Sequence, residues 1–140
     1  MLNTLQELLT FEYIYLLANW GVVPFWLLLI FVPNHTITKF FCYSVIPFFL
    51  LGLSYVFVSY QIFLDGNILG GFKLYRGLDG LDEIYANESF RLIFWLHFLA
   101  VSLFTGTWIA GDCIRHMVPK IFSIPCIAIT NFAGPVGIII

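Results

Sequence analysis

Two side chains of the types that act as general acids or bases lie on one long apolar stretch of this chain. These are His97 and Asp112, and the same stretch carries the aromatic residues Phe104 and Trp108. At 100° per residue, the other three positions fall within about 60° of His97 on a helix. The spacing predicts one face with an imidazole, two rings and a terminal carboxylate, which suits a long apolar ligand with polar ends.

A structural role is the alternative reading of both titratable residues. His97 would then bond to a neighbouring helix, and Asp112 would pair with Arg115 or His116 one turn further on. Asn19 is open to the same two readings, because a polar side chain inside an apolar stretch either bonds to another helix or contacts a ligand. The sequence leaves these alternatives open.

Other kinds of site find little support in the sequence. His35, Asp112 and His116 are suitable metal-ligand types, but their spacing matches no known ligand pattern, so we predict no metal site. A nucleic-acid partner is also excluded, because six Lys and Arg residues stand against eight acidic ones and form no cluster. We expect the three cysteines to be packing residues: Cys42, Cys113 and Cys126.

The elements that must position these residues are long uncharged runs. Hydrophobic residues make up 61% of the chain and charged ones only 10%, which is typical of a membrane protein. A chain of 140 residues leaves no room for a second domain. A membrane span needs about 20 apolar residues. We therefore predict a single-domain, all-α, four-helix transmembrane bundle. Its spans lie near residues 13–32, 40–64, 92–111 and 121–140.

Prolines in three of these runs predict departures from straight helices. We expect Pro24 and Pro47 to bend the first and second spans, and Pro125 lies in a fourth span that also contains Gly134 and further breakers. The opening residues 1–15 lack a basic region and a small-residue cleavage site, so we expect the first helix to stay in the mature protein.

The loop between the second and third spans, residues 65–91, is the one long connection. Apolar and charged residues alternate there at helical spacing, which favours a short amphipathic helix in the membrane interface, although a solvated loop is the alternative. The apolar set is Leu74, Leu78, Leu81 and Tyr85. Asn87 begins a glycosylation sequon, but we interpret it or Ser89 as the N-cap of the third span.

Orientation and location are weakly specified. Basic residues divide three and three between the two sides, and we place the short loops toward the cytoplasm or its organellar equivalent. The chain is expected in a membrane as a multi-pass protein: a bacterial inner membrane, a thylakoid or another organelle membrane. The lipid bilayer is then its first partner.

A specific tract runs through the third and fourth predicted spans. It reads Trp95-Leu96-His97, Gly106-x-Trp108, Asp112, Ile124-Pro125-Cys126, Thr130 and Gly134-Pro135-x-Gly137, with Asn19 and Pro24-x-Trp26 upstream. The chain resembles the abscisic-acid-deficient-four-like family of small membrane proteins, whose plant members are needed to make neoxanthin from violaxanthin. The resemblance covers most of the chain.

The resemblance implies a carotenoid ligand and no further cofactor. Its chemistry is the redox-neutral conversion of an epoxide to an allene, which needs an acid and a base. We expect His97 and Asp112 as the catalytic residues, with ligand contacts from Asn19, Trp26, Phe104 and Trp108. Two observations oppose this assignment. Fifteen residues of helix separate His97 from Asp112 by roughly 22 Å, and Ser102 stands where the family usually has aspartate.

A different class of function remains open. Aromatic residues make up 19% of the chain, while charges within the predicted spans are almost absent. Such surfaces suit a non-catalytic structural or assembly subunit of a larger membrane complex, photosynthetic or respiratory. A channel is the weakest alternative, because uncharged spans do not favour ion conduction.

Overall fold

The computed structural model describes residues 10–66, 68–134 and 136–139. Pro135 and Ile140 of the fourth predicted span lie outside the described residues, as do residues 1–9 and 67. The described chain is helical and contains no strand, which confirms the predicted all-α class. Its elements are α2 Phe11–Phe31, α3 Thr36–Cys42, α4 Ile46–Leu64, the 3-10 helix η1 Ile68–Arg76, α5 Leu78–Ala86, α6 Glu88–Arg115, α7 Lys120–Ala133 and α8 Val136–Ile139.

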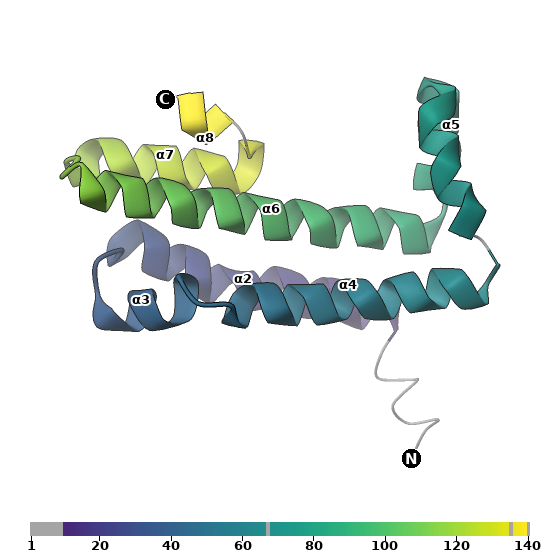
Figure 1. Ribbon diagram of the computed structural model, residues 1–140, viewed down its shortest axis with the longest axis horizontal. Coiled ribbons are helices and arrows are strands. Elements are labelled where there is room, and N and C mark those ends of the chain that lie inside the picture. The colour runs from purple at the N-terminus through teal and green to yellow at the C-terminus, as the bar shows by residue number, and fades with distance from the viewer. Residues whose placement is uncertain (1–9, 67, 135, 140) are drawn as a thin grey trace, which may run out of the picture.

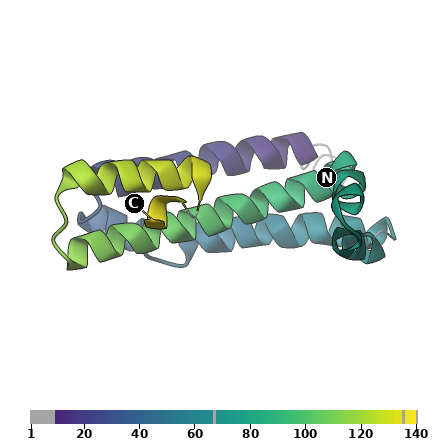
Figure 2. The same ribbon diagram turned by 90° about the horizontal axis from the view of Figure 1, so that it is seen from above.

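Three segments are long and apolar enough to cross a membrane: Phe11–Phe31, Thr36–Leu64 and Glu88–Arg115. They match the first three predicted spans. α2, α4 and α6 lie side by side along the long axis of the molecule, and α6 packs against α2, α4 and α7 (Figures 1 and 2). Completely buried side chains at these contacts include Leu29, Val58 and Leu103.

The second predicted span is not the single bent helix that was expected. It divides into α3 and α4, separated by residues 43–45. The Ser44 hydroxyl donates to the Phe41 carbonyl (3.0 Å) and accepts from the Ile46 amide (3.2 Å), so it caps both helix ends. Pro47 lies in the first turn of α4 rather than at a kink. Proline is tolerated there, because the backbone N–H that it lacks would have no partner within the helix. Pro24 lies inside α2, which continues as one helix through it.

The fourth predicted span also differs from expectation. α7 has only 14 residues, about 21 Å at 1.5 Å per residue. It ends at Gly134, whose φ of +49° turns the chain back, and the short α8 then packs on α7. Gly137 permits this return because a Cβ there would overlap Thr130. As both views show, α7 therefore accompanies α6 for only part of its length (Figures 1 and 2).

A close contact joins α2 to α6. A Cβ added at Gly106 would lie 2.6 Å from the Trp26 ring, and Trp26 is 4% exposed. Glycine at this position lets the buried indole fill the space directly against the α6 backbone. This contact determines how closely α2 and α6 approach each other at Gly106.

The long loop forms two short helices, η1 and α5, where one was expected. Gly77, at φ +107°, makes the turn between them, and Gly80 packs directly on the Lys73 carbonyl. α5 stands across the end of α6 (Figure 1). α5 buries Gly80 and Ile84, while the predicted apolar residue Leu78 is 79% exposed. The Asn87 side chain accepts from the amides of residues 89 and 90, which confirms the predicted N-cap of α6.

Candidate functional site

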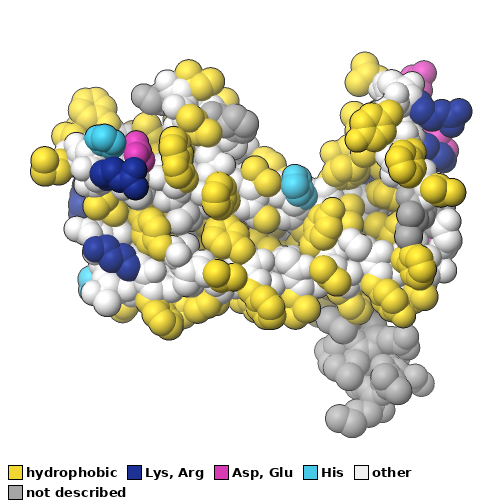
Figure 3. Space-filling model, viewed as in Figure 1, with side chains coloured by type: hydrophobic (Ala, Val, Ile, Leu, Met, Phe, Trp, Pro, Cys, Tyr) yellow, Lys and Arg dark blue, Asp and Glu magenta, His cyan; other side chains and the backbone are white. Residues whose placement is uncertain are grey.

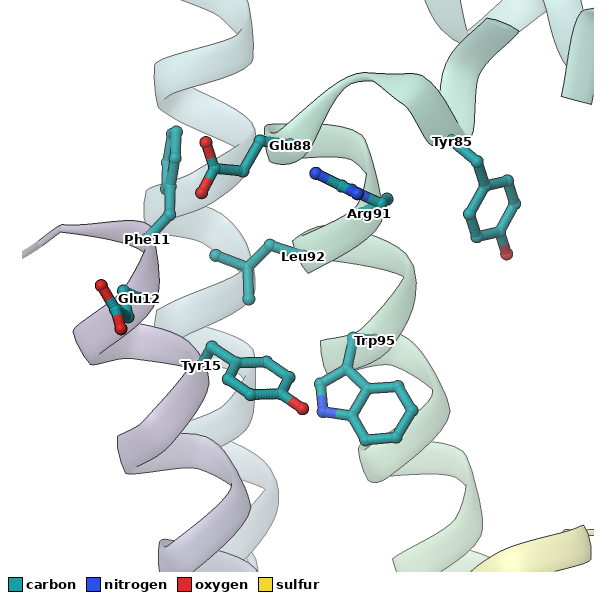
Figure 4. Close-up of a pocket in the computed structure, with 8 residues that line it drawn as sticks. All are labelled: Phe11, Glu12, Tyr15, Tyr85, Glu88, Arg91, Leu92 and Trp95. Atoms are coloured by element: carbon teal, nitrogen blue, oxygen red, sulfur yellow. The ribbon is translucent and has the colours of Figure 1, made fainter. Parts of the chain in front are cut away.

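An open cleft lies between the first turns of α2 and α6, at the end of the bundle that carries η1 and α5. We call it the α2–α6 cleft. It has a volume of about 550 Å³, and its lining comes from α2, α5 and α6 (Figure 4). The lining residues are Phe11, Glu12, Tyr15, Tyr85, Glu88, Arg91, Leu92 and Trp95.

α7 ends well before it reaches this cleft. α7 packs in the groove between α2 and α6, but at its end Gly134 has only reached Ser102 of α6, where an added Cβ would lie 3.9 Å from the Ser102 hydroxyl. Glu88 precedes Ser102 by 14 positions, so α6 extends about 21 Å beyond this point. Among the described residues, α7 and α8 therefore leave this part of the groove uncovered.

Three charged side chains gather in the cleft. Glu12 lies in the first turn of α2 and Glu88 in the first turn of α6, where helix dipoles favour negative charge. Arg91 follows Glu88 by one turn on α6 and lines the same cleft. Two carboxyl groups and a guanidinium are thus available to bind a polar group, or to give and take a proton.

Aromatic rings form the other wall. Trp95 packs between Tyr15, at a centroid distance of 6.0 Å, and Phe98, at 5.4 Å. The indole Nε1 of Trp95 donates a hydrogen bond of 2.9 Å to Asn19 Oδ1, which fixes the ring against α2. The cleft therefore combines a flat apolar wall with a charged rim, as expected for a ligand that is mostly apolar with one oxygenated end.

The predicted pair His97 and Asp112 is not brought together. Both lie on the uninterrupted helix α6, and His97 is exposed on its outer side beside the Tyr55 ring, at a centroid distance of 6.5 Å. Asp112 forms the ion pairs anticipated as its structural role, with Arg115 at 3.9 Å and His116 at 3.6 Å. One substrate group cannot contact both residues.

The predicted ligand contacts separate into three groups. Asn19 bonds to Trp95 and so reaches the α2–α6 cleft indirectly, while Trp26 is buried in the core. Phe104 and Trp108 line a second cavity of about 240 Å³ together with Asp112. Phe104 follows Trp95 by nine residues, about half a turn around the helix, so the second cavity lies on the opposite side of α6.

Sequence reasoning missed the charged rim, although one signal was present. Spans alternate in direction, so the first and third begin on the same side, and Glu12, Glu88 and Arg91 stand at those two beginnings. That these three side chains line one cleft also depends on the groove between α2 and α6 being open, which no local sequence pattern indicates. Within residues 10–66, 68–134 and 136–139, no three His, Cys, Asp or Glu side chains are placed to hold a metal ion.

Ser102 is 2% exposed, and its hydroxyl has no hydrogen-bond partner among the described residues. It lies at the closed end of the uncovered groove, next to Gly134. This position, where the family resemblance predicts aspartate, therefore faces the inside of the helix packing rather than the surface.

Comparison with known proteins agrees with these features. The sequence model of the ABA DEFICIENT 4-like family matches residues 13–140. The chain is 25% identical over 129 residues to Protein ABA DEFICIENT 4, chloroplastic, of Arabidopsis thaliana. The aligned residues cover 90% of this chain and 57% of that relative's length. No solved structure matches the fold significantly. Because the family match extends from α2 through α8, the chain belongs to the ABA DEFICIENT 4-like family.

Proposed function

We propose that this chain is a multi-pass integral membrane protein that binds an oxygenated carotenoid and isomerises its epoxide to an allene. The α2–α6 cleft is the observation that carries the proposal. It opens on a bundle whose α2, α4 and α6 segments have the length and hydropathy of membrane spans. Family membership supports the same ligand class, since the plant members of the family serve neoxanthin synthesis.

The shape of the cleft suits one end of such a ligand. A hydroxylated epoxide ring would lie among Glu12, Glu88 and Arg91, and the polyene would continue over the Trp95 ring along the uncovered groove. Typical small-molecule sites have volumes of about 300 to 1,000 Å³, with apolar walls and a few polar groups that fix orientation. At about 550 Å³, the cleft can hold a ring and the first part of a polyene.

The carboxyl groups of the cleft match the chemistry. One carboxylic acid protonates the epoxide oxygen, the C–O bond to the chain-bearing ring carbon breaks, and the oxygen remains on the neighbouring carbon as a hydroxyl. A carboxylate removes a proton from the adjacent chain carbon, and the new double bond completes the allene. Glu12 and Glu88 can divide these roles, whereas His97 and Asp112 cannot because of their separation along α6.

The test is expression of the full chain in membranes that contain violaxanthin, followed by analysis of bound pigment and product. We expect Glu88→Gln and Glu12→Gln to reduce neoxanthin formation at least tenfold while pigment still binds, because positioned acids and bases contribute about 10²- to 10⁴-fold. Asp82→Asn is the matched control, since this exposed carboxyl lies on α5 and does not line the cleft.

Two results would overturn the proposal. Wild-type protein that neither holds pigment nor forms neoxanthin would refute both the ligand and the reaction. Product loss in His97→Ala or Asp112→Asn, with the two glutamine variants active, would return the acid and base roles to the residues expected from the sequence.

A second candidate is an assembly subunit of a larger membrane complex. Its support is the exposed imidazole of His97 on α6, which is followed one and two turns later by the exposed apolar side chains of Val101 and Phe104. An ionisable group on a lipid-facing surface is unfavourable unless another molecule covers it. Purification from native membranes in a fixed ratio with other subunits, without pigment, would favour this function over the first.

A further inference from the structure

The η1–α5 unit, residues 68–86, has large apolar side chains that the bundle does not cover. Leu69, Phe72, Tyr75 and Leu78 are 75%, 66%, 87% and 79% exposed. All four come from η1 or from the start of α5. Of these, only Leu78 belongs to the apolar set expected from helical spacing, because α5 turns Gly80 and Ile84 toward its neighbours instead.

The unit is a single rigid piece rather than a loose loop. Its two helices touch backbone to backbone at Gly80 and Lys73, and the Lys73 ammonium pairs with the Glu83 carboxylate. The unit is fixed to the bundle by Tyr85, which stacks on Phe94 of α6 at 5.0 Å, and by contact of Gly70 with Phe90. The exposed apolar side chains are therefore held outward by the fold.

The unit lies where the apolar length of the bundle ends. It projects sideways at the start of α6, across the direction of the long helices (Figure 1). In the space-filling view, the charged side chains of this lobe gather on its outer edge, and hydrophobic ones lie on the side that faces the middle of the molecule (Figure 3). If α2, α4 and α6 cross a membrane, the lobe lies in the membrane plane with its charges toward water.

We propose that the η1–α5 unit inserts its exposed apolar side chains into the boundary between lipid headgroups and acyl chains. The lipid surface is the partner that this arrangement fits, since amphipathic helices lie in that plane with the apolar side inward. The unit contains two basic residues and three acidic ones, Lys73 and Arg76 against Asp79, Asp82 and Glu83, so its net charge is −1. Insertion is therefore driven by apolar burial and does not require anionic lipids.

This insertion gives the α2–α6 cleft a defined depth. Tyr85 of α5 both lines the cleft and stacks on α6, so the unit that enters the interface also forms one wall of the cleft. A ligand dissolved in the bilayer then reaches the charged rim from the side, without leaving the lipid. The inference rests on the proposal that the long helices cross a membrane, but not on catalysis.

The test uses the full chain with its three cysteines changed to alanine, in nanodiscs of uncharged lipid that each hold one copy. A polarity-sensitive fluorophore is attached at Phe72→Cys or Leu78→Cys, with Asp82→Cys as the control on the charged side. We expect blue-shifted emission and several-fold weaker quenching by aqueous iodide at the two apolar positions than at the control. The difference should persist at high salt.

A fourth label, at Leu53→Cys on the exposed side of α4, separates two kinds of failure. A buried signal at residue 53, with residues 72 and 78 as accessible as residue 82, would overturn insertion of the unit and leave the membrane proposal intact. Aqueous signals at all four positions would overturn membrane crossing itself. Circular dichroism of each labelled protein checks that the helices are retained.

Discussion

At the scale of single residues, Asn19 illustrates how a polar side chain inside an apolar helix finds its role. Its carbonyl oxygen accepts from the Trp95 indole at 2.9 Å, across 76 positions of sequence. The bond satisfies two polar groups that would otherwise meet hydrocarbon, and it also fixes the ring that forms a wall of the cleft. The structural reading of Asn19 is confirmed, and it serves the candidate site at the same time.

Removing this bond should have a measurable but limited effect. We expect Asn19→Leu to lower the free energy of unfolding by about 0.6 to 1.7 kcal/mol, the range for hydrogen bonds between membrane helices. A double-mutant cycle with Trp95→Phe, measured by unfolding in detergent, isolates the pairwise energy. A coupling energy of zero would show that the bond does not stabilise the bundle.

At the scale of elements, one ion pair joins η1 to α5. The hydrogen bond and the charge of Lys73 together hold the pKa of the Glu83 carboxyl below its ordinary value of 4.5. A carboxyl with a lowered pKa in the folded state stabilises that state above the unfolded pKa. The stabilisation is lost as the pH falls through the folded pKa, so acid should loosen the packing of η1 on α5.

Hydrogen exchange of the amides in residues 69–86 provides the measurement. We expect protection of these amides to fall as the pH is lowered from about 7 to about 3, after correction for intrinsic exchange rates. Glu83→Gln should show reduced protection already at neutral pH and a smaller dependence on acid. Asp82→Asn is the control that keeps the Lys73 pair. An unchanged acid response in Glu83→Gln would assign the sensitivity to other carboxyl groups.

At the scale of the whole molecule, the alternating directions of α2, α4 and α6 place the connections at two opposite ends. The α2–α3 and α6–α7 links lie at one end, and η1 and α5 lie at the other (Figure 1). In a membrane these ends would face different compartments. The orientation with the short loops toward the cytoplasm or its organellar equivalent stays a prediction.

Cysteine labelling in sealed vesicles tests this arrangement. In the cysteine-free protein, a membrane-impermeant maleimide should label either Asn34→Cys and Lys120→Cys together, or Asp82→Cys alone, until the vesicles are opened. Each vesicle preparation must first be shown to have a uniform protein orientation. Labelling of all three positions in such intact vesicles would contradict a bundle in which three helices cross the membrane.

The sequence by itself determined which stretches are helical, because apolar length, helix caps and prolines act locally. It placed three long apolar helices and the Asn87 cap, and its motifs indicated the family. Its candidate site was incomplete for the same reason. Periodicity placed His97 and Asp112 on one stretch of helix, but it could not say which side of α6 other helices would cover.

Only the tertiary structure decided where the cleft lies. Gly134 and Gly137 turn the chain back after α7, and the effect of that turn appears on α2 and α6, far away in sequence. Had the fourth run continued straight to residue 140, it would have extended about 10 Å further over the groove, as far as Trp95 but not to Glu12 and Glu88. A cleft depends on the absence of a neighbour, and this absence follows from the packing of separate helices rather than from any local pattern.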